Sequence, residues 1–380
     1  MSFTLRYDEE HALLRDQARR WLAERVTPAE LRRLAKDARG DEPALWGELA
    51  ALGWTGLVIP EAQGGAGLGA VHLAVLAEES GRRLLPSPLL PTLLAAKGIE
   101  HAGEAAQREH WLPGIARGEA VATLAHAEPG GAWEAAATSA TLERGRISGT
   151  KHHVWAAGTA QLLLVPVRER GALRLVLVRS DAQGVTIEPE VGLDPSRRAG
   201  RVRFESAACE LLAGDAAAAW QAWLPWAWLA LAAEMAGGAD AVLTLTAAYT
   251  ATRVQFDKPI ASFQAIKHPL VNVLIAVEQL RTLVYAAASA LDAGDPEADR
   301  LARMAKAAAC EAYPFACSRA VQFHGGYGFT EDCDAHLYLR RALASRPALG
   351  DAREHRAAIA ALLLLPDPAH EVEAAPLIGA

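Results

Sequence analysis

The spacing of apolar residues changes twice along the chain, and this change constrains the fold more than any other feature. Up to about residue 120 the spacing is helical; between residues 10 and 25, for example, Leu14, Ala18 and Trp21 fall on one face. From about Val121 to Gly214, short apolar or alternating runs separated by Gly, Pro and Asp are typical of strands. Helical spacing then returns. The pattern predicts an α+β chain with an antiparallel sheet in its middle domain, and the three expected domains are residues 1–120, 121–213 and 214–380.

Two long helices are predicted in the last domain. Residues 270–291 carry one continuous apolar stripe, and the run Asp292–Pro296 that follows them is a strong stop signal. Residues 297–324 are expected to form the antiparallel partner of this helix. Pro314 removes a backbone donor inside that partner and predicts a kink there.

Composition argues against several classes of protein. A chain of 380 residues is too long for one ordinary core. A formal net charge of −7 argues against a nucleic-acid-binding surface. No apolar run is long enough to predict a membrane span, and the N-terminal residues lack the pattern of a secretory signal. Four cysteines without CxxC spacing predict free thiols in a reducing cytoplasm.

No metal site is predicted from the histidines. The sequence contains no HExxH pattern. His152 and His153 are adjacent, and neighbouring residues on a strand are expected to point to opposite faces of the sheet. The two rings are therefore not expected to share a metal ion.

Two segments of the last domain combine residue types that suit a nucleotide. Around Pro259 the first segment has a cation at Arg253, aromatic rings and an amide, and a planar guanidinium can donate two hydrogen bonds to a phosphate. The alternative interpretation is a loop between two helices with Arg253 solvated. The second segment, Gln322–Phe329, has three glycines in four positions, so its backbone can approach a ligand closely and present amides to an anion.

Together these segments closely resemble the acyl-CoA dehydrogenase family of flavoenzymes. The resemblance extends over nearly the whole chain and includes Pro60-Glu61, Gly64-Gly65 and the run Ala127–Gly130. It implies a helical N-terminal domain, a middle β domain and a C-terminal four-helix bundle. It also implies FAD as cofactor, an acyl-CoA substrate, an electron acceptor such as an electron-transfer flavoprotein, and a homodimer or homotetramer.

The resemblance assigns the cofactor contacts residue by residue. The arginine and the phenylalanine that precede the proline of the first segment would contact the FAD of a neighbouring subunit, with a glutamine beside them. The glycine-rich loop would pack against the adenosine-diphosphate part of the same cofactor. The matching residues in this sequence are Arg253, Phe256, Gln264, Gln322, Gly325 and Gly326.

Two positions in the middle domain depart from the family pattern. The family usually has Glu-Pro-x-x-Gly-Ser-Asp, whose small polar residues approach the flavin or substrate, whereas this chain has Trp133 in place of the serine. The family also has a Trp-Ile-Thr-Asn-like strand that covers the flavin. Here His153 would replace the covering indole, and Trp155 would replace the threonine by changing the pocket.

The largest departure concerns the catalytic base. Desaturation of an acyl thioester requires a carboxylate that removes the proton α to the carbonyl, and the family's usual glutamate position is occupied here by Leu349. A second position used by some relatives is occupied by Ala227. Glu234 lies two helical turns beyond Ala227 and is the candidate for a non-standard base; the alternative is a buried, hydrogen-bonded helix residue. Asp351 is a lesser candidate.

Three functions remain open from the sequence. The first is an FAD-dependent dehydrogenase that introduces an α,β double bond into an acyl-CoA thioester with a non-standard base. The second is a non-catalytic partner subunit in a heteromer with a paralogous chain that carries the base. The third is a flavin oxidase or monooxygenase on the same fold. A further hypothesis is that Trp226 and Trp228 narrow or fill the acyl cavity.

Overall fold

The structure is a computed structural model that describes residues 7–37, 40 and 42–364. Its N-terminal part is helical, as predicted. The first helix begins where the side chain of Asp8 accepts hydrogen bonds from the amides of Glu10 and His11, and the second begins at Thr27 followed by Pro28, a favoured first residue. The helices of this part are α1 (Glu9–Arg25), α2 (Pro28–Lys36), α3 (Pro43–Ala51), α4 (Ala70–Arg82), α5 (Leu89–Ala102) and α6 (Ala105–Ala116).

A mixed sheet follows, with the strand order β6-β7-β3-β2-β4-β5-β8 and β1 paired to β4. Neighbouring strands are antiparallel except that β1 and β2 run parallel to β4, so the predicted antiparallel sheet is confirmed for most of its pairs. The strands are β1 (Ala122–Leu124), β2 (Thr141–Glu143), β3 (Arg146–Trp155), β4 (Leu162–Glu169), β5 (Ala172–Arg179), β6 (Val185–Glu190), β7 (Ala199–Ala208) and β8 (Glu210–Leu211).

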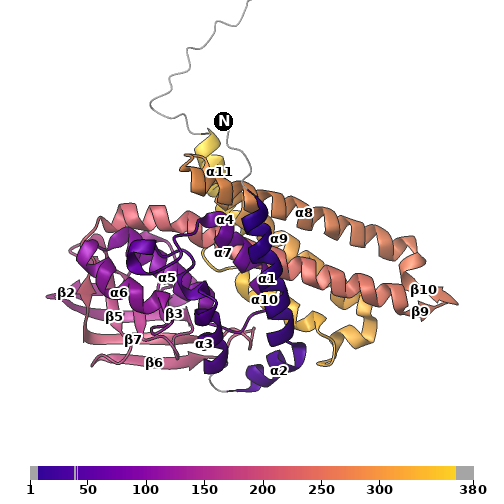
Figure 1. The fold of residues 1–380 in the computed structure, drawn as a ribbon, viewed down its shortest axis with the longest axis horizontal. Coiled ribbons are helices and arrows are strands. Elements are labelled where there is room, and N and C mark those ends of the chain that lie inside the picture. Colours follow the sequence, from indigo (N-terminus) through magenta and orange to yellow (C-terminus); the bar gives the residue numbers. More distant parts are fainter. Residues whose placement is uncertain (1–6, 38–39, 41, 365–380) are drawn as a thin grey trace, which may run out of the picture.

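The C-terminal part is a bundle of long helices that lies beside the sheet and projects away from it (Figure 1). The two predicted helices are found. The first begins earlier than expected, at Gln264, and the second is continuous in secondary structure through Pro314. The elements are α7 (Ala216–Thr252), the hairpin β9 (Val254–Gln255) and β10 (Lys258–Pro259), α8 (Gln264–Ala293), α9 (Ala298–His324), α10 (Ala335–Ser345) and α11 (Ala352–Leu364).

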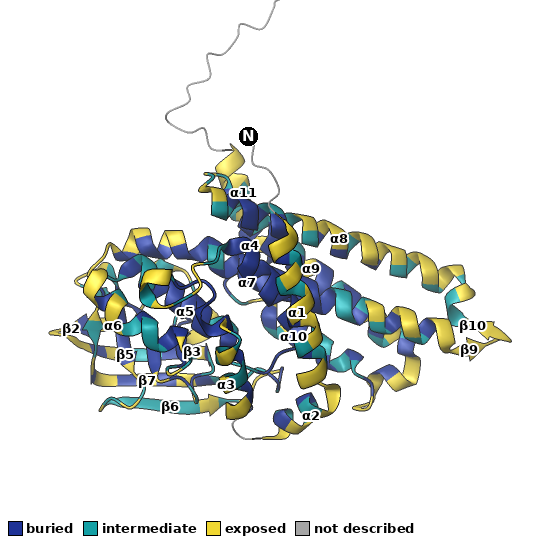
Figure 2. Ribbon diagram, viewed as in Figure 1, coloured by how far each residue is buried: buried dark blue, intermediate teal, exposed yellow. Residues whose placement is uncertain are grey.

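Helix α7 is the central element of the molecule. Its middle, residues 223–239, is buried almost throughout, and the helix packs against α4, α5 and α9 (Figure 2). Helices α4 and α7 cross with their backbones in contact, because a side chain on Gly81 would collide with the carbonyl of Glu234, and one on Gly237 with the carbonyl of Glu78. Only glycine permits this approach at both positions.

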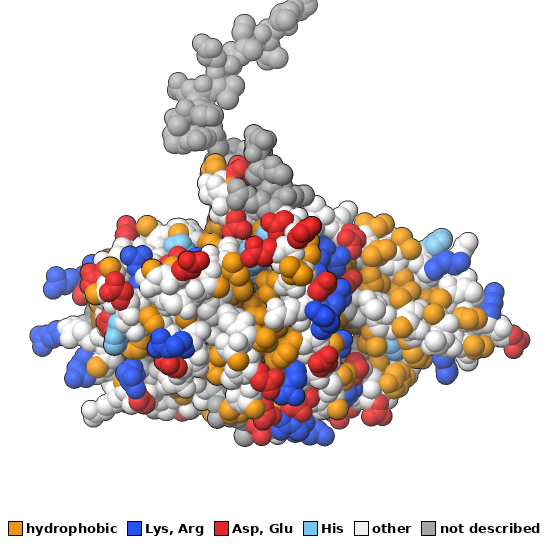
Figure 3. Space-filling view, in the orientation of Figure 1, with side chains coloured by type: hydrophobic (Ala, Val, Ile, Leu, Met, Phe, Trp, Pro, Cys, Tyr) orange, Lys and Arg blue, Asp and Glu red, His pale blue; other side chains and the backbone are white. Residues whose placement is uncertain are grey.

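Helices α7 and α8 are both long and apolar enough to cross a membrane by length and composition alone. In α7, 72% of the apolar window is buried inside the protein, as expected for a core helix, whereas in α8 only 28% is buried. Val271, Leu274 and Ile275 are among the exposed residues of α8, and apolar side chains gather on this part of the surface (Figure 3). This apolar face of α8 suits contact with another chain.

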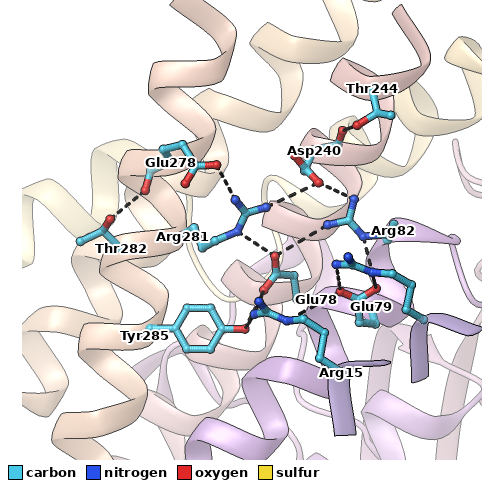
Figure 4. Close-up of polar contacts among 11 residues, drawn as sticks. Arg15, Glu78, Glu79, Arg82, Asp240, Thr244, Glu278, Arg281, Thr282 and Tyr285 are labelled. Carbon is cyan, nitrogen blue, oxygen red and sulfur yellow. Dashed lines mark hydrogen bonds and ion pairs between the residues drawn. The ribbon is translucent and has the colours of Figure 1, made fainter. Parts of the chain in front are cut away.

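A network of charged residues joins α1, α4, α7 and α8 (Figure 4). Glu78 of α4 is buried and accepts hydrogen bonds from Arg15 (3.2 Å), Arg281 (2.9 Å) and the hydroxyl of Tyr285 (2.6 Å). Three donors from two other helices thus converge on one carboxylate. Buried ionised groups require such partners, because an unpaired charge in the interior is strongly unfavourable.

Replacing Glu78 tests the contribution of this network. We expect Glu78→Ala to lower the free energy of unfolding by about 3–5 kcal/mol, because two arginines would lose a buried counter-ion. The matched control is Glu205→Ala, which removes the exposed pair with Arg203 (3.2 Å) and should change stability by less than about 1 kcal/mol. Urea unfolding of both variants measures the difference; equal losses would show that the network does not hold the helices together.

Candidate cofactor and active site

The end of β3 is distorted where the sequence predicted a flavin-facing strand. The pairing of β3 with β7 shifts register between Lys151 and Val154, and His153 has a left-handed backbone with φ of 52°. Consequently the expectation that His152 and His153 point to opposite faces is wrong. The bulge lets both rings reach one carboxylate, with Nδ1 of His152 at 2.8 Å and Nδ1 of His153 at 3.1 Å from Glu190.

Trp155 lies at the end of the same strand and contacts a buried charge network. The guanidinium carbon of Arg197 lies 4.4 Å from the centroid of the Trp155 ring. Arg197 also pairs with Glu234 of α7, and Oε1 of Glu234 accepts a second hydrogen bond from Arg341 at 3.0 Å. Glu234 is 4% exposed, so the structure shows it as a buried carboxylate between two guanidinium groups.

Arg341 connects this carboxylate to the loop that follows β6. It pairs with Asp194 and donates to the hydroxyl of Ser196 at 2.9 Å. Burial disfavours its charge, but Asp194 and Glu234 outweigh burial and raise the pKa of Arg341. Burial likewise opposes the charge of Asp194, and Arg341 together with Ser196 outweighs it and lowers the pKa of Asp194. Arg341 therefore stays charged in the interior.

The usual base position is closed by an indole. Leu349 is 4% exposed and has a left-handed backbone with φ of 54°. Nε1 of the fully buried Trp228 donates to the carbonyl of Leu349 at 2.9 Å, and Nζ of Lys306 donates to the carbonyl of Gly350 at 2.8 Å. Ala227, the second base position, is also fully buried. Neither position offers a carboxylate or an open space beside its backbone.

Two more aromatic side chains complete this closure. Trp133 packs edge-on against Trp228 with ring centroids 6.1 Å apart, and His355 lies 5.2 Å from the same indole. A side chain added at Gly350 would lie 2.9 Å from His355 and 3.1 Å from Trp133. We call Trp133, Trp228 and His355 the aromatic plug. It fills the surroundings of the loop at Leu349. The hypothesis that Trp226 and Trp228 narrow or fill the acyl cavity stays a prediction.

The residues predicted to contact the dinucleotide lie at the other end of the bundle. Arg253 directly follows α7 and is exposed, and the ring of Phe256 is 86% exposed. Tyr249 of α7 stacks on His324 of α9 with centroids 4.2 Å apart, which holds the glycine-rich loop beside Arg253. Gln264 and Gln322 are exposed as well.

The exposed end of the bundle fits a dinucleotide phosphate. Side chains added at Gly325 or Gly326 would meet no atom within 4 Å, so a ligand can approach the backbone there. Arg253 and the ring of Phe256 are free to contact it. FAD, bound there, would be held by this cation and these backbone amides, whereas the surroundings of Leu349 are filled by the aromatic plug.

Within one chain, the predicted flavin-facing residue Trp155 and the predicted dinucleotide-contacting residue Arg253 do not lie close together. Trp155 contacts Arg197, which pairs with Glu234, and Arg253 follows Glu234 by 19 positions at the end of α7. At 1.5 Å per residue this length of helix spans roughly 28 Å. Figure 1 shows the β9–β10 hairpin at the end of the bundle remote from the sheet. A cofactor that contacts both a Trp155 and an Arg253 therefore needs two chains, one to supply each residue.

Comparison with known proteins agrees with this architecture. The family model described as "Acyl-CoA dehydrogenase, N-terminal domain" matches residues 8–119, and "Acyl-CoA dehydrogenase, C-terminal domain" matches residues 216–364. The chain belongs to the acyl-CoA dehydrogenase family. The predicted fold is thereby confirmed, and so is the prediction of an FAD-dependent oxidoreductase of the acyl-CoA dehydrogenase type.

Several members of the acyl-CoA dehydrogenase family are similar over almost their full length. Acyl-CoA dehydrogenase IpdE2 of Mycobacterium tuberculosis is 32% identical and covers 91% of this chain and 95% of its own. The solved Tcur3481-Tcur3483 steroid ACAD variant is 34% identical, with a TM-score of 0.86 over 95% of this chain and 98% of its own. The ChsE4-ChsE5 complex of Mycobacterium tuberculosis is 26% identical, with a TM-score of 0.87 over 96% and 100%.

Sequence reasoning missed part of this site. It noted Trp133 only as a departure from the family pattern, although an indole in place of a serine was a signal that the space beside the flavin is filled. It did not single out Arg341, His355 or Lys306, because nothing in their spacing distinguishes them from ordinary helix residues. The role of Glu234 as a base stays a prediction.

Two histidines whose pKa values are lowered, His355 and His126, predict how stability depends on pH. Burial, with Lys306 and Arg303 nearby, lowers the pKa of His355 to about 3 from 6.5, and burial with Lys151 lowers the pKa of His126 to about 4. Below pH 6.5 the unfolded chain binds protons that the folded chain does not, so stability falls as the pH drops from 6.5 toward 4. Each histidine can contribute up to about 1.4 kcal/mol per pH unit.

His355→Gln should make this pH dependence less steep between pH 6.5 and 4. His110→Gln, at an exposed position on α6, is the matched control and should leave the dependence unchanged. Unfolding free energies measured across this pH range compare the two variants with the parent. Parallel pH curves for the parent and His355→Gln would contradict a neutral, buried imidazole at this position.

Proposed function

We propose that the chain is one subunit of an FAD-dependent acyl-CoA dehydrogenase and that a related chain supplies the catalytic carboxylate. The observation that carries this proposal is the closure of both base positions: Leu349 is buried under the indole of Trp228, and Ala227 is fully buried. Leucine and alanine accept no proton. The exposed cation and glycines at the other end of the bundle are retained, and they can serve a cofactor seated mainly on a partner.

The chemistry of desaturation determines which groups each of the two chains contributes in this proposal. FAD, when bound, supplies the acceptor for the β-hydride of the acyl group. Removal of the α-proton needs a positioned carboxylate, whose loss costs roughly 10²–10⁴-fold in rate. In this proposal the partner chain provides that carboxylate and binds the acyl-CoA. This chain contributes Arg253 and Phe256, and the backbone at Gly325 and Gly326.

The surface of the bundle supports assembly with a second chain. The apolar face of α8 lies on the same bundle as Arg253. Partner contact there would remove Val271, Leu274 and Ile275 from water and place the β9–β10 hairpin against the other subunit. Two similar solved structures, Tcur3481-Tcur3483 and ChsE4-ChsE5, are each named for two proteins. An electron-transfer flavoprotein as electron acceptor and a cytoplasmic location remain predictions.

One observation favours a second candidate function, in which the chain turns over by itself with Glu234 as base. Oε2 of Glu234 has no hydrogen-bond partner among the described residues, so this oxygen is free to accept a proton. Against this, Arg341 and Arg197 both bind Oε1, so the carboxylate already serves as the counter-ion of two buried guanidinium groups.

Anaerobic bleaching of the flavin by acyl-CoA thioesters distinguishes the two candidates. We expect the purified chain alone not to bleach and a co-expressed mixture with a paralogue carrying the glutamate to do so. In the mixture, Glu234→Gln should bleach normally. Full bleaching by the chain alone that Glu234→Gln abolishes would establish the second candidate instead.

Arg253 provides a separate test of the shared cofactor site. Arg253→Ala should weaken retention of FAD by the mixed oligomer about 10- to 100-fold, because a charged hydrogen bond to phosphate is lost. Arg20→Ala, which removes an exposed arginine of α1, is the control and should retain FAD normally. Gel filtration with flavin absorbance measures retention; equal retention in both variants would remove Arg253 from the cofactor site.

A further inference from the structure

The glycine-rich loop between α9 and α10 is held from two sides. At its start, His324 stacks on Tyr249 of α7 with ring centroids 4.2 Å apart. After its end, residues 331–334 are hydrogen-bonded to Arg32 of α2, a helix of the N-terminal part. Side chains added at Gly325 or Gly326 would meet no atom within 4 Å. The backbone proposed to face the cofactor is therefore open, while the loop is anchored on both sides of it.

Arg32 donates three hydrogen bonds to the segment that follows the glycine-rich loop. Its Nε donates to the carbonyl of Glu331 at 3.0 Å, and its Nη2 donates to the carbonyl of Asp332 at 3.1 Å and to Oδ1 of Asp334 at 2.6 Å. A guanidinium can bond several acceptors at once because its donors form a rigid planar fork. Lysine has a single nitrogen on a flexible stem, so it does not reproduce this pattern.

The carbonyl of Asp332 links Arg32 to the glycine-rich loop itself. This carbonyl also accepts a hydrogen bond from the hydroxyl of Tyr327 at 3.1 Å, and Tyr327 directly follows Gly326. The carbonyl of Tyr327 in turn accepts from the hydroxyl of Thr330 at 2.7 Å. One acceptor thus joins a cation of the N-terminal part to the residue next to the open glycines.

Helix α2 is itself fixed to the end of the sheet. Nη2 of Arg198, in the connection between β6 and β7, donates to the carbonyl of Ala35 at 2.8 Å and to the carbonyl of Asp37 at 2.5 Å. Both carbonyls lie at the C-terminal end of α2, where helical partners are missing and a cation is favourable. The carbonyl of Arg198 accepts from the amide of Ala156, directly after β3, at 2.9 Å. Helix α2 therefore connects the sheet to the glycine-rich loop.

We propose that Arg32 is a positioning residue that holds the glycine-rich loop in the conformation that contacts FAD. This role rests on the proposed function, in which the backbone at Gly325 and Gly326 contacts a cofactor seated mainly on the partner chain. A loop that is fixed before binding loses less conformational freedom when the ligand arrives, so the affinity is higher. Without Arg32 the loop samples further conformations, and the apparent affinity falls with the fraction of loops that remains competent to bind.

Hydrogen exchange of the full chain without cofactor tests the anchoring of the loop by itself. Arg32→Ala should speed exchange in residues 327–334 roughly 3- to 10-fold, because the hydrogen-bonded amides of Thr330 and Cys333 would open more often. Arg32→Lys should behave like Arg32→Ala. The matched control is Arg33→Ala, since Arg33 lies on the same helix but is 53% exposed and pairs with glutamates instead of the loop. Exchange in Arg32→Ala equal to that of the parent would overturn the proposal.

Retention of FAD by the mixed oligomer tests the link to the cofactor. Arg32→Ala should weaken retention roughly 3- to 10-fold, whereas Arg33→Ala should retain FAD normally. Tyr327→Phe removes the other donor to the carbonyl of Asp332, so the double variant Arg32→Ala/Tyr327→Phe should lose less than the product of the two single losses.

The variants also separate this role from the proposed function. Normal retention in Arg32→Ala together with a loss in Arg253→Ala would overturn the positioning role and leave the subunit role intact. Normal retention in both variants would overturn both. A loss in Arg32→Ala that equals the loss in Arg33→Ala would show a general effect of changing α2 and would also overturn the positioning role.

Discussion

The structure depends on one buried cation. Arg341 of α10 pairs with Asp194, donates to Ser196 in the loop after β6, and binds Glu234 at the centre of α7. These contacts join the sheet to the bundle at a point where no solvent stabilises either charge. Removing one partner would leave a buried charge uncompensated, a loss of about 3–5 kcal/mol. The position of the sheet relative to α7 follows from this connection.

The length of α7 then determines which of the predicted cofactor contacts a single chain can make. The helix fixes the sheet-facing residues at one end and Arg253 at the other, and it is too long for one small cofactor region to include both. Exposed apolar side chains on α8 and the exposed ring of Phe256 lie on the part of the bundle that remains without a partner. In the proposed assembly a second chain would satisfy both conditions at once, because it would cover the apolar surface and bring its own sheet to Arg253. The geometry of the helix therefore favours assembly.

Much of the fold follows from local patterns in the sequence. The apolar stripe and stop signal around residues 270–296 predict α8 correctly, and the alternation after Val121 predicts most strands, because both depend on neighbours in sequence. The bulge at His153 was not predictable, since a shift of register depends on the partner strand. The pairing of Glu234 with Arg341 joins residues far apart in sequence, and only the tertiary structure shows it. For the same reason Leu349 revealed the missing base, but not the indole that covers it.

The two ends of the bundle can change independently. Residues more than about 10 Å apart without shared partners contribute to stability nearly additively. The aromatic plug around Leu349 therefore leaves the stacking of Tyr249 on His324, and the exposure of Arg253, unaffected. A chain can lose its own base and still present an intact cation and glycine loop to another subunit. The absence of a base at one end is therefore compatible with cofactor contacts at the other end. Both features are used together in the proposed arrangement, in which this subunit depends on a related partner.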